Sequence, residues 1–289
     1  AFANAISGTY TVKEGVKVIE ANSFANATRM TSIVIPASVE TIGDGAFRNC
    51  GLNSVVFASG KDNAATKLDI GAQAFYGCPI KGIFTLPERL TKVGDEAFKS
   101  VNATEIKFTG NKLTAIGNRA FENCDYLETI TLSDGVTSIG DEAFWFCEKL
   151  QTINLPNTIE TLGDDMLNKC YSLQAINVAE GCAKYSTFGG ILYENKDGAP
   201  SVLVLCPTLN SGDEENKVII PNTVIEVKDS AFVDNNGIVT IEFTDYDPDF
   251  MAKNELRLGE GLFIGAKTLE TVKLPKGLKQ IPSGAFTGI

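Results

Sequence analysis

The chain repeats itself. Phe47 follows Ala46 in the segment GDGAFRNC, and an equivalent residue, called an anchor below, returns along the whole sequence. The anchors are Phe24, Phe47, Phe75, Phe98, Phe121, Phe144, Leu167, Phe232, Phe263 and Phe286. The steps between them are 23, 28, 23, 23, 23, 23, 65, 31 and 23 residues, so the period is 23 and three steps carry insertions. One short unit cannot bury its own apolar face, whereas stacked units can.

Each repeat keeps one order of residue types, L-x-x-I-x-I-P-x-x-V-x-x-I-G-D-x-A-F-x-x-C. The I-x-I step has a period of two and predicts a short strand with one face inward. Proline lacks a ladder donor and ends that strand, and V-x-x-I predicts a second short extended run with a bend. Glycines four residues before the anchor predict a tight turn at positive φ. The turn residues beside them are Asp44, Asp95, Asp141 and Asp164.

These segments predict a β-rich repeat solenoid with a 23-residue period. It is built from short parallel β-strands, turns and short helical turns at A-F-x-x-C, and the strands of successive coils are spaced by about 4.8 Å. Nine of the ten anchors are phenylalanine, in a chain with 17 phenylalanines. Most aromatic side chains are therefore expected in the core and not on a binding surface.

The consensus resembles the BspA-like leucine-rich repeat family. The resemblance is clearest in residues 127–163 (LETITLSDGVTSIGDEAFWFCEKLQTINLPNTIETLG) and 269–286 (LETVKLPKGLKQIPSGAF), and it extends over the chain from about Tyr10 onward. This resemblance implies an extracellular or surface-attached bacterial protein, often one part of a longer adhesin that binds host matrix proteins or other cells.

The longer steps mark insertions. We expect residues 1–9 to be an N-terminal cap or an expression remnant, and residues 10–289 to form a single solenoid. The longest step holds an insert at about 179–216, where Asp197 and Gly198 between two β-prone runs predict a β-hairpin. A loop insert follows at about 245–258. Since Ile289 lies only three residues past the last anchor, either more chain follows or the sheet edge is open.

The composition excludes several classes of function. The chain has no histidine, which removes Ser-His-Asp and Cys-His catalysis and imidazole metal ligands. With 25 Lys and Arg against 36 Asp and Glu the net charge is −11, which disfavours nucleic acids and anionic membranes. No apolar run reaches the roughly 20 residues that a transmembrane helix needs. We expect a non-catalytic protein without a cofactor.

Two sets of residues with metal or redox chemistry have simpler interpretations. Five cysteines lie three residues after an anchor, and we expect buried thiols there because stacked side chains point in parallel. Cys182 and Cys206 flank the hairpin, and the sequence leaves open whether they pair.

Asp245, Asp247 and Asp249 alternate as in calcium loops, but Phe250 and Leu256 stand where an EF-hand needs Gly and Glu. A solvated acidic loop is favoured there over a loose calcium site.

The five cysteines that lie three residues after an anchor are Cys50, Cys78, Cys124, Cys147 and Cys170.

The outward residues of the predicted strands form the natural interaction surface, since solenoids present extended faces. The strands are rich in Thr, which is also simply favoured on exposed strands. Trp145 and its aromatic neighbours after the anchors predict either an exposed patch or a plug of the opposite side. The candidate interaction surface comprises Thr129, Thr131, Trp145, Thr152, Asn154, Asn177, Glu242 and Lys273.

Three functions are compatible with this sequence. The first is a secreted or cell-surface leucine-rich repeat protein with an extracellular matrix or surface protein as its adhesive partner, and a glycan as the alternative partner. The second is a structural spacer module of a larger envelope protein. The third is a carbohydrate-binding or carbohydrate-active protein. The sequence contains no P-loop, no G-x-S-x-G motif and no dinucleotide-binding motif, so no known catalytic motif indicates an enzyme.

Overall fold

A computed structural model describes residues 5–60, 67–210, 212–246 and 256–289. The chain divides into two compact units. Unit 1 comprises Ala1–Leu150 and Thr158–Cys170, and unit 2 comprises Gln151–Asn157 and Tyr171–Ile289. The described residues form stacked coils of short strands and contain no α-helix, as the 23-residue repeat predicts for a β-solenoid.

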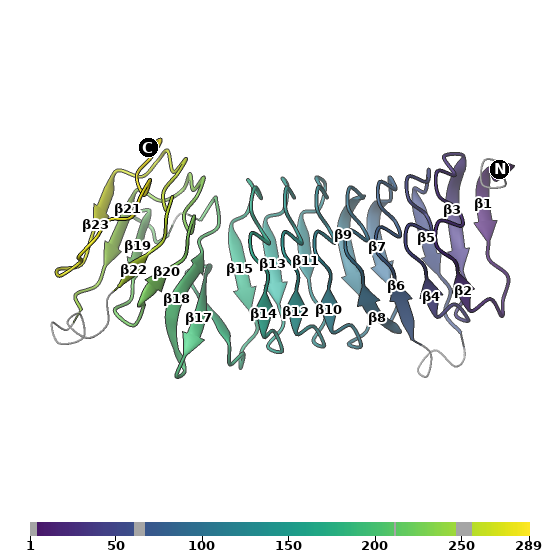
Figure 1. Ribbon diagram of the computed structural model, residues 1–289, viewed down its shortest axis with the longest axis horizontal. Coiled ribbons are helices and arrows are strands. Elements are labelled where there is room, and N and C mark those ends of the chain that lie inside the picture. Colours follow the sequence, from purple (N-terminus) through teal and green to yellow (C-terminus); the bar gives the residue numbers. More distant parts are fainter. Residues whose placement is uncertain (1–4, 61–66, 211, 247–255) are drawn as a thin grey trace. The chain divides into compact units, whose positions relative to one another are not determined.

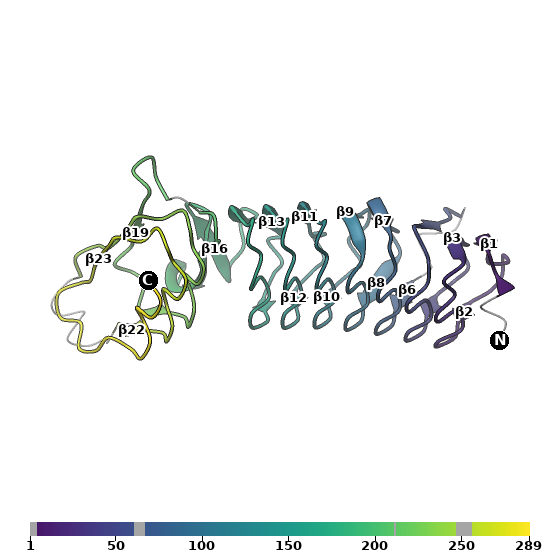
Figure 2. The ribbon, with the colours of Figure 1, turned by 90° about the horizontal axis from the view of Figure 1, so that it is seen from above.

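The first row of strands in unit 1 comes from the I-x-I segments. Its strands are β1 (Gly8–Thr11), β3 (Met30–Ile35), β5 (Ser54–Phe57), β7 (Lys81–Leu86), β9 (Asn102–Phe108) and β11 (Thr129–Thr131). All the pairs among them are parallel, in two groups, β1-β3-β5 and β7-β9-β11. Figures 1 and 2 show this row as one layer of unit 1. The parallel arrangement repeats from Gly8, so β1 already belongs to the stack.

The second row comes from the V-x-x-I segments and lies on the opposite side of each coil (Figure 2). Its strands are β2 (Val18–Ile19), β4 (Thr41–Ile42), β6 (Leu68–Ile70), β8 (Leu90–Val93), β10 (Ala115–Ile116), β12 (Ser138–Ile139) and β14 (Thr161–Leu162). They form one parallel seven-stranded sheet in chain order. The pairing of Ile116 with Ile139, 23 residues apart, confirms that one repeat makes one coil.

The anchors fill the space between the two rows of unit 1. Five successive stacked pairs run from Phe24 to Phe144, with ring centroids 5.1–5.5 Å apart and interplanar angles of 6–16°. The side chains from Phe47 to Phe144 are completely buried. A continuous phenylalanine ladder is therefore the core of unit 1.

The anchor segments are tight turns and not the short helical turns expected from A-F-x-x-C. Backbone N–H groups two residues before the anchor, at the anchor, and two residues after it donate to the next coil. In one coil these are Gly45, Phe47 and Asn49, which donate to Ala72, Ala74 and Tyr76 at 2.7–2.8 Å. The turn thus carries its own coil-to-coil ladder, which a helical turn would not provide.

The glycines four residues before the anchor do not have positive φ, so that expectation was wrong. A Cβ on Gly94 would lie 2.6 Å from the carbonyl carbon of Gly71, and one on Gly117 would lie 2.6 Å from the amide nitrogen of Asp95. Close approach of successive coils therefore requires glycine at this position. Positive φ occurs two residues before and two residues after the anchor, for example at Glu96 and Ser100.

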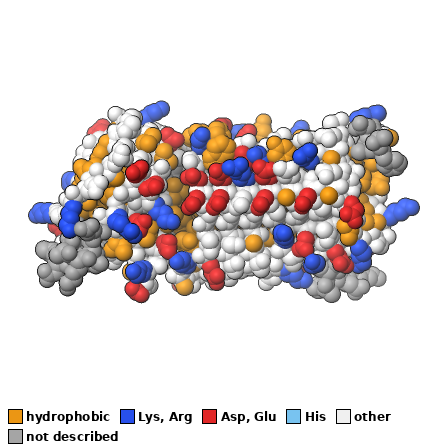
Figure 3. Space-filling view, viewed as in Figure 1, with side chains coloured by type: hydrophobic (Ala, Val, Ile, Leu, Met, Phe, Trp, Pro, Cys, Tyr) orange, Lys and Arg blue, Asp and Glu red, His pale blue; other side chains and the backbone are white. Residues whose placement is uncertain are grey.

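The aspartates that follow these glycines link successive coils. Asp95 Oδ1 accepts from the Asn118 amide at 2.8 Å, Asn118 Oδ1 from Asp141, and Asp141 Oδ1 from Asp164, both at 2.9 Å. Each side chain satisfies a backbone donor of the following coil. Acidic side chains accordingly form rows across the face of unit 1 in Figure 3.

The in-phase cysteines are buried thiols, as expected from their parallel stacking. Cys124 Sγ donates to the Phe98 carbonyl at 3.4 Å, and Cys147 Sγ donates to the Phe121 carbonyl at 3.2 Å. Burial raises the pKa of Cys124 well above its usual value. No disulfide joins any of the seven cysteines, all of which lie in the described part of the chain.

Unit 2 contains parallel pairs and one antiparallel insert (Figure 1). The parallel pair β13 (Thr152–Leu155) and β15 (Ala175–Val178) is followed by β16 (Tyr185–Phe188), β17 (Ile191–Lys196) and β18 (Ala199–Leu205), which pair antiparallel. Asp197 and Gly198, both at positive φ, make the turn between β17 and β18. Parallel stacking resumes when β18 pairs with β20 (Glu226–Val227) and β20 with β22 (Arg257–Leu258).

The remaining strands of unit 2 are β19 (Lys217–Ile220), β21 (Thr240–Phe243) and β23 (Thr271–Lys273), which form a parallel three-stranded sheet. Its anchors Phe232, Phe263 and Phe286 lie in file with ring centroids 5.2–5.5 Å apart. Phe232 and Phe263 are buried in a cluster that also includes Tyr193 from the insert. The same repeat rules therefore build both units.

Candidate interaction surfaces

The strand face of unit 1 presents polar side chains in register. Thr129 and Thr131 on β11 lie beside Glu105 and Lys107 on β9, and the buried Ile130 lies beside Ile106. Both threonines are exposed, as the alternation predicts. Lys107 Nζ lies 3.4 Å from Glu105 Oε1 along the same strand.

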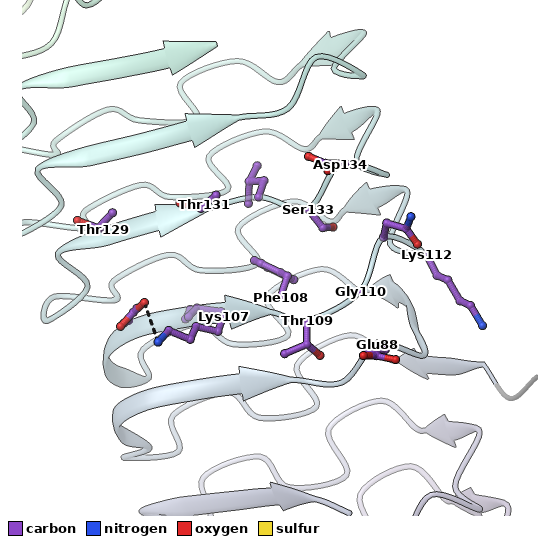
Figure 4. A pocket seen from close by; sticks show the side chains of 14 residues that line it. Glu88, Lys107, Phe108, Thr109, Gly110, Lys112, Thr129, Thr131, Ser133 and Asp134 are labelled. Carbon is purple, nitrogen blue, oxygen red and sulfur yellow. Dashed lines mark ion pairs between the residues drawn. The ribbon is translucent and has the colours of Figure 1, made fainter. Parts of the chain in front are cut away.

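A groove of about 800 Å³ opens where this face turns the corner toward the second row (Figure 4). Phe108 lies between Ser133 and Thr109 in this view, at the ends of β9 and β11. The lining residues are Glu88, Glu105, Ile106, Lys107, Phe108, Thr109, Gly110, Asn111, Lys112, Thr129, Thr131, Leu132, Ser133 and Asp134. Two of the predicted surface residues, Thr129 and Thr131, therefore contribute to a concave site.

The groove coincides with two successive repeats that lack the corner proline. Five repeats have proline eleven residues before the anchor, but Gly110 and Ser133 occupy this position in the repeats ending at Phe121 and Phe144. The first of these repeats also ends its strand one residue earlier, which adds Thr109 to the corner. Ser133 has a smaller side chain than the proline that five other repeats carry at this position. Gly110 instead allows close approach of the coils, because a Cβ there would lie 2.3 Å from the Glu88 carbonyl oxygen.

Ser133 lies on the floor of this groove. The residue is 9% exposed, and its Oγ is buried without a hydrogen-bond partner among the described residues. By contrast, Thr109 Oγ1 donates to the Leu86 carbonyl at 2.8 Å. A buried hydroxyl without a partner is costly, because it has lost its bonds to water.

Sequence reasoning missed Glu105 and Lys107 on the strand face. In the repeats that begin at Phe47 and Phe98 the inward residues Val55 and Ile106 lie eight residues after the anchor, whereas most other repeats have the inward residue at nine. The outward residues shift with the inward ones, so the general spacing did not select Glu105 and Lys107. The spacing of Ile106 and Phe108 was the available signal.

The predicted residues on β13 and β15 of unit 2 form an amide contact. Asn154 lies beside Asn177, and the Asn177 side-chain amide donates to Asn154 Oδ1 at 2.9 Å. Thr152 lies beside Ala175 in the same register. This small polar face is therefore regular.

Glu242 and Lys273 come together on another sheet of unit 2. Glu242 on β21 lies beside Lys273 on β23, with Lys273 Nζ 3.2 Å and Lys217 Nζ 2.6 Å from Glu242 Oε2. Hydrogen bonding to Lys217 and then to Lys273 lowers the pKa of Glu242. Lys273 is exposed, and Glu242 and Lys217 are partly exposed, so water screens this charge ladder and it is worth little in stability.

Trp145 lies on the turn side of unit 1, with Phe146 in edge-to-face contact at 4.8 Å between ring centroids. Both side chains are half-buried. They border a pocket of about 460 Å³ built from three successive coils. The other lining residues are Ser100, Asn102, Asn123, Asp125 and Glu148.

Phe146 occupies a strained backbone position. Its φ of 61° falls two residues after the anchor, where other coils of unit 1 have Asn, Gly, Ser or Lys. A bulky residue in the left-handed region is an outlier that the surrounding structure must maintain. Lys169 Nζ lies 5.0 Å and 5.1 Å from the ring centroids of Trp145 and Phe146.

The rim of this pocket is acidic and aromatic. Burial and the neighbouring Glu148 carboxylate raise the pKa of Asp125. Tyr126 is 47% exposed, and Lys149 Nζ lies 4.7 Å from its ring centroid. The sequence had left an exposed patch and an internal plug as alternatives. The structure shows partly exposed rings beside two carboxylates in unit 1, while the exposed Tyr171 belongs to unit 2.

Among the residues that the structure describes, no group of Cys, Asp and Glu could hold a metal ion. Of the calcium candidates, Asp247 and Asp249 lie outside those residues, and the Asp245 carbonyl accepts from the Asn222 amide at 3.3 Å. The described ranges include no helix long and apolar enough to cross a membrane.

The repeat pattern defines a leucine-rich repeat protein by class. The model of the BspA type leucine rich repeat region matches residues 1–67, 68–191 and 212–289 in six copies. The chain therefore belongs to the BspA-type leucine-rich repeat family, a family of interaction modules that are generally not enzymes. None of the curated proteins matches the chain.

Solved structures share the fold. A leucine rich cell surface protein of Faecalibacterium prausnitzii is 24% identical with a TM-score of 0.73, over 98% of this chain and 73% of that one. The pneumococcal vaccine antigen PcpA is 20% identical with a TM-score of 0.63, over 94% and 62%. A leucine-rich repeat protein of Bacteroides ovatus is 19% identical with a TM-score of 0.57, over 97% and 87%.

Proposed function

We propose that the chain is a secreted or cell-surface repeat module that binds a protein partner in adhesion, with the contact centred on Trp145. The aromatic pair of Trp145 and the strained Phe146 carries this proposal. Strain of this kind concentrates at functional sites. Trp and Tyr are enriched among the residues that dominate protein interfaces, so the pair has the composition of a binding centre.

The chemistry of the pocket indicates the kind of contact. Asp125 and Glu148 lie beside the rings, and their two neighbouring carboxylates attract an incoming cation. An aromatic face next to carboxylates favours a Lys or Arg side chain of the partner. The proposed partner therefore presents a basic side chain at this point.

The location outside the cell rests on similarity. One structural neighbour is named a cell surface protein and another a vaccine antigen, and both names describe those proteins. The family and the missing catalytic motifs support a non-catalytic role without a cofactor. A spacer module without its own partner is the competing function, and a bland polar surface would favour it.

The test is binding of the purified chain to immobilised fibronectin, fibrinogen and other matrix proteins at physiological salt. We expect saturable binding that weakens at least tenfold in Trp145→Ala. Asn168→Ala is the matched control, because Asn168 occupies the same repeat position in the next coil of unit 1. Lys273→Ala probes the strand face of unit 2 separately. Absence of binding to every matrix protein would favour the spacer function.

A further inference from the structure

The corner groove of unit 1 is not used by the contact at Trp145. It is formed by β9, β11 and the turns that follow them, whereas Trp145 follows an anchor (Figure 4). Its volume of about 800 Å³ lies within the usual range of ligand sites, about 300–1,000 Å³. It also contains the unpartnered Ser133 hydroxyl.

We propose that this groove binds a neutral oligosaccharide. The partly exposed ring of Phe108 offers an apolar surface for the C–H face of a sugar ring, with Ser133 and Thr109 on either side. Asn111 and Asp134 supply amide and carboxylate groups at the rim, which pair with vicinal hydroxyls as donors and acceptors. One apolar platform surrounded by several polar groups matches the composition that a sugar requires.

The charges of the groove favour a neutral ligand. Its lining holds three carboxylates, from Glu88, Glu105 and Asp134, and two ammonium groups, from Lys107 and Lys112. Glu105 and Lys107 already form an ion pair. The remaining charges nearly balance, so the groove has no strong preference for an anion or a cation.

Ser133 is the group that points to a ligand. Its Oγ has no partner among the described residues, although it is nine-tenths buried on the groove floor. A hydroxyl both donates and accepts, so one sugar hydroxyl would satisfy it in either direction once the Ser133 side chain turns its buried Oγ toward the groove. The strand backbones beside it are already paired between coils, so an extended peptide gains no added strand there.

The corner prolines provide a substitution that should close the groove and preserve the fold. Val136 N donates to the Ser133 carbonyl at 3.0 Å, just as Val39 N donates to the Pro36 carbonyl at 3.2 Å. Ser133 therefore has the backbone arrangement of a proline corner. Ser133→Pro removes the hydroxyl and fills the space with a ring that five other repeats carry at this position.

The experiment is isothermal titration calorimetry of the whole chain with tetra- to hexasaccharides of glucose, xylose, mannose and galactose. We expect at least one oligosaccharide to bind saturably and Ser133→Pro to weaken it at least tenfold, with an unchanged circular dichroism spectrum. If Ser133→Pro does not fold, Asn111→Ala replaces it. Its matched control is Asn222→Ala, which changes the same repeat position in unit 2.

The proposal is overturned if no oligosaccharide of the panel binds, or if binding is the same in Ser133→Pro and Asn111→Ala. Binding of a peptide that depends on Ser133 would also overturn it. Trp145→Ala separates the two proposals, because we expect it to leave oligosaccharide binding unchanged and to weaken only the protein contact.

Discussion

Backbone conformation at single residues explains most of the residue preferences around each anchor. Positions two residues before and after each anchor lie in the left-handed region, and Asn, Gly, Ser or charged residues occupy nearly all of them. These conformations turn the N–H groups toward the next coil. The exceptions in unit 1 are the polar Gln73 and Phe146, and the Phe146 side chain gains nothing from this backbone region and loses about 1–3 kcal/mol there.

Replacement of Phe146 should separate stability from binding. We expect Phe146→Asn to raise the free energy of unfolding by about 0.5–1 kcal/mol, because Asn tolerates positive φ better. The same variant should weaken the protein contact at Trp145. Guanidinium denaturation and the binding assay measure the two effects. The control is Asn26→Phe, which puts a phenylalanine at the equivalent position of another coil and should lower stability without creating binding. A loss of stability in Phe146→Asn would contradict the strain argument.

The residues of the groove show how far sequence reasoning reaches at a site. Thr129 and Thr131 follow the strand alternation and could be predicted as exposed. The absence of proline at Gly110 and Ser133 is visible in the sequence, but its consequence depends on two corners being stacked together. The close approach at Gly117 was equally hidden, because a phase-locked glycine fits a turn and a coil contact alike.

The phenylalanine ladder of unit 1 carries much of its stability. Phe98 is completely buried between Phe75 and Phe121, with centroid distances of 5.5 Å and 5.4 Å. We expect Phe98→Ala to cost about 3–5 kcal/mol, since the neighbouring rings cannot close the cavity. Phe24 is only half-buried, so Phe24→Ala should cost clearly less. Chemical denaturation monitored by circular dichroism compares them, and equal losses would refute a ladder-based core.

The charge ladder on β19, β21 and β23 of unit 2 predicts a pH effect. Hydrogen bonds from Lys217 and Lys273 lower the pKa of Glu242 below the ordinary value of 4.5. A lowered pKa stabilises the folded state above the unfolded value, and that contribution is lost as the pH falls through the folded value. A ¹³C NMR titration should give a midpoint below 4.5 for Glu242, and Lys217→Met should move it upward. An unmoved midpoint would show that the Lys217 contact does not persist in solution.

At the scale of the whole molecule, the fold could be predicted because every coil repeats the same rule. Anchor, strand and corner positions recur together, so an error in one coil does not alter the assignment of the others. The 65-residue step interrupts this pattern, and there only the Asp197-Gly198 turn guided the prediction of antiparallel strands. Local turn chemistry therefore replaced periodicity in the insert of unit 2.

The net charge of −11 has a consequence for the stability of the folded chain. Stacking places like charges in file, as in the acidic rows of Figure 3, and the ion pairs are mostly exposed. Repulsion within the rows should therefore outweigh the attraction in the pairs. Raising NaCl from 0.01 to 0.2 M shortens the Debye length from about 30 Å to below 10 Å. We expect Tm to rise by about 2–4 °C, the shift that about 1 kcal/mol produces in a domain of this size.

The variant Asp141→Asn tests whether the acidic row is the origin of this salt effect. Asn118 already occupies the same repeat position and accepts the same coil-to-coil hydrogen bond through its Oδ1, so Asn at 141 keeps that bond and removes one charge. Stability at low salt should increase, and the salt-dependent rise in Tm should become smaller. Differential scanning calorimetry of both proteins across the NaCl series makes the comparison. A Tm that falls with salt in the wild type would instead mean that the exposed ion pairs dominate, and the stacked carboxylates would then be balanced by the lysines and arginines around them.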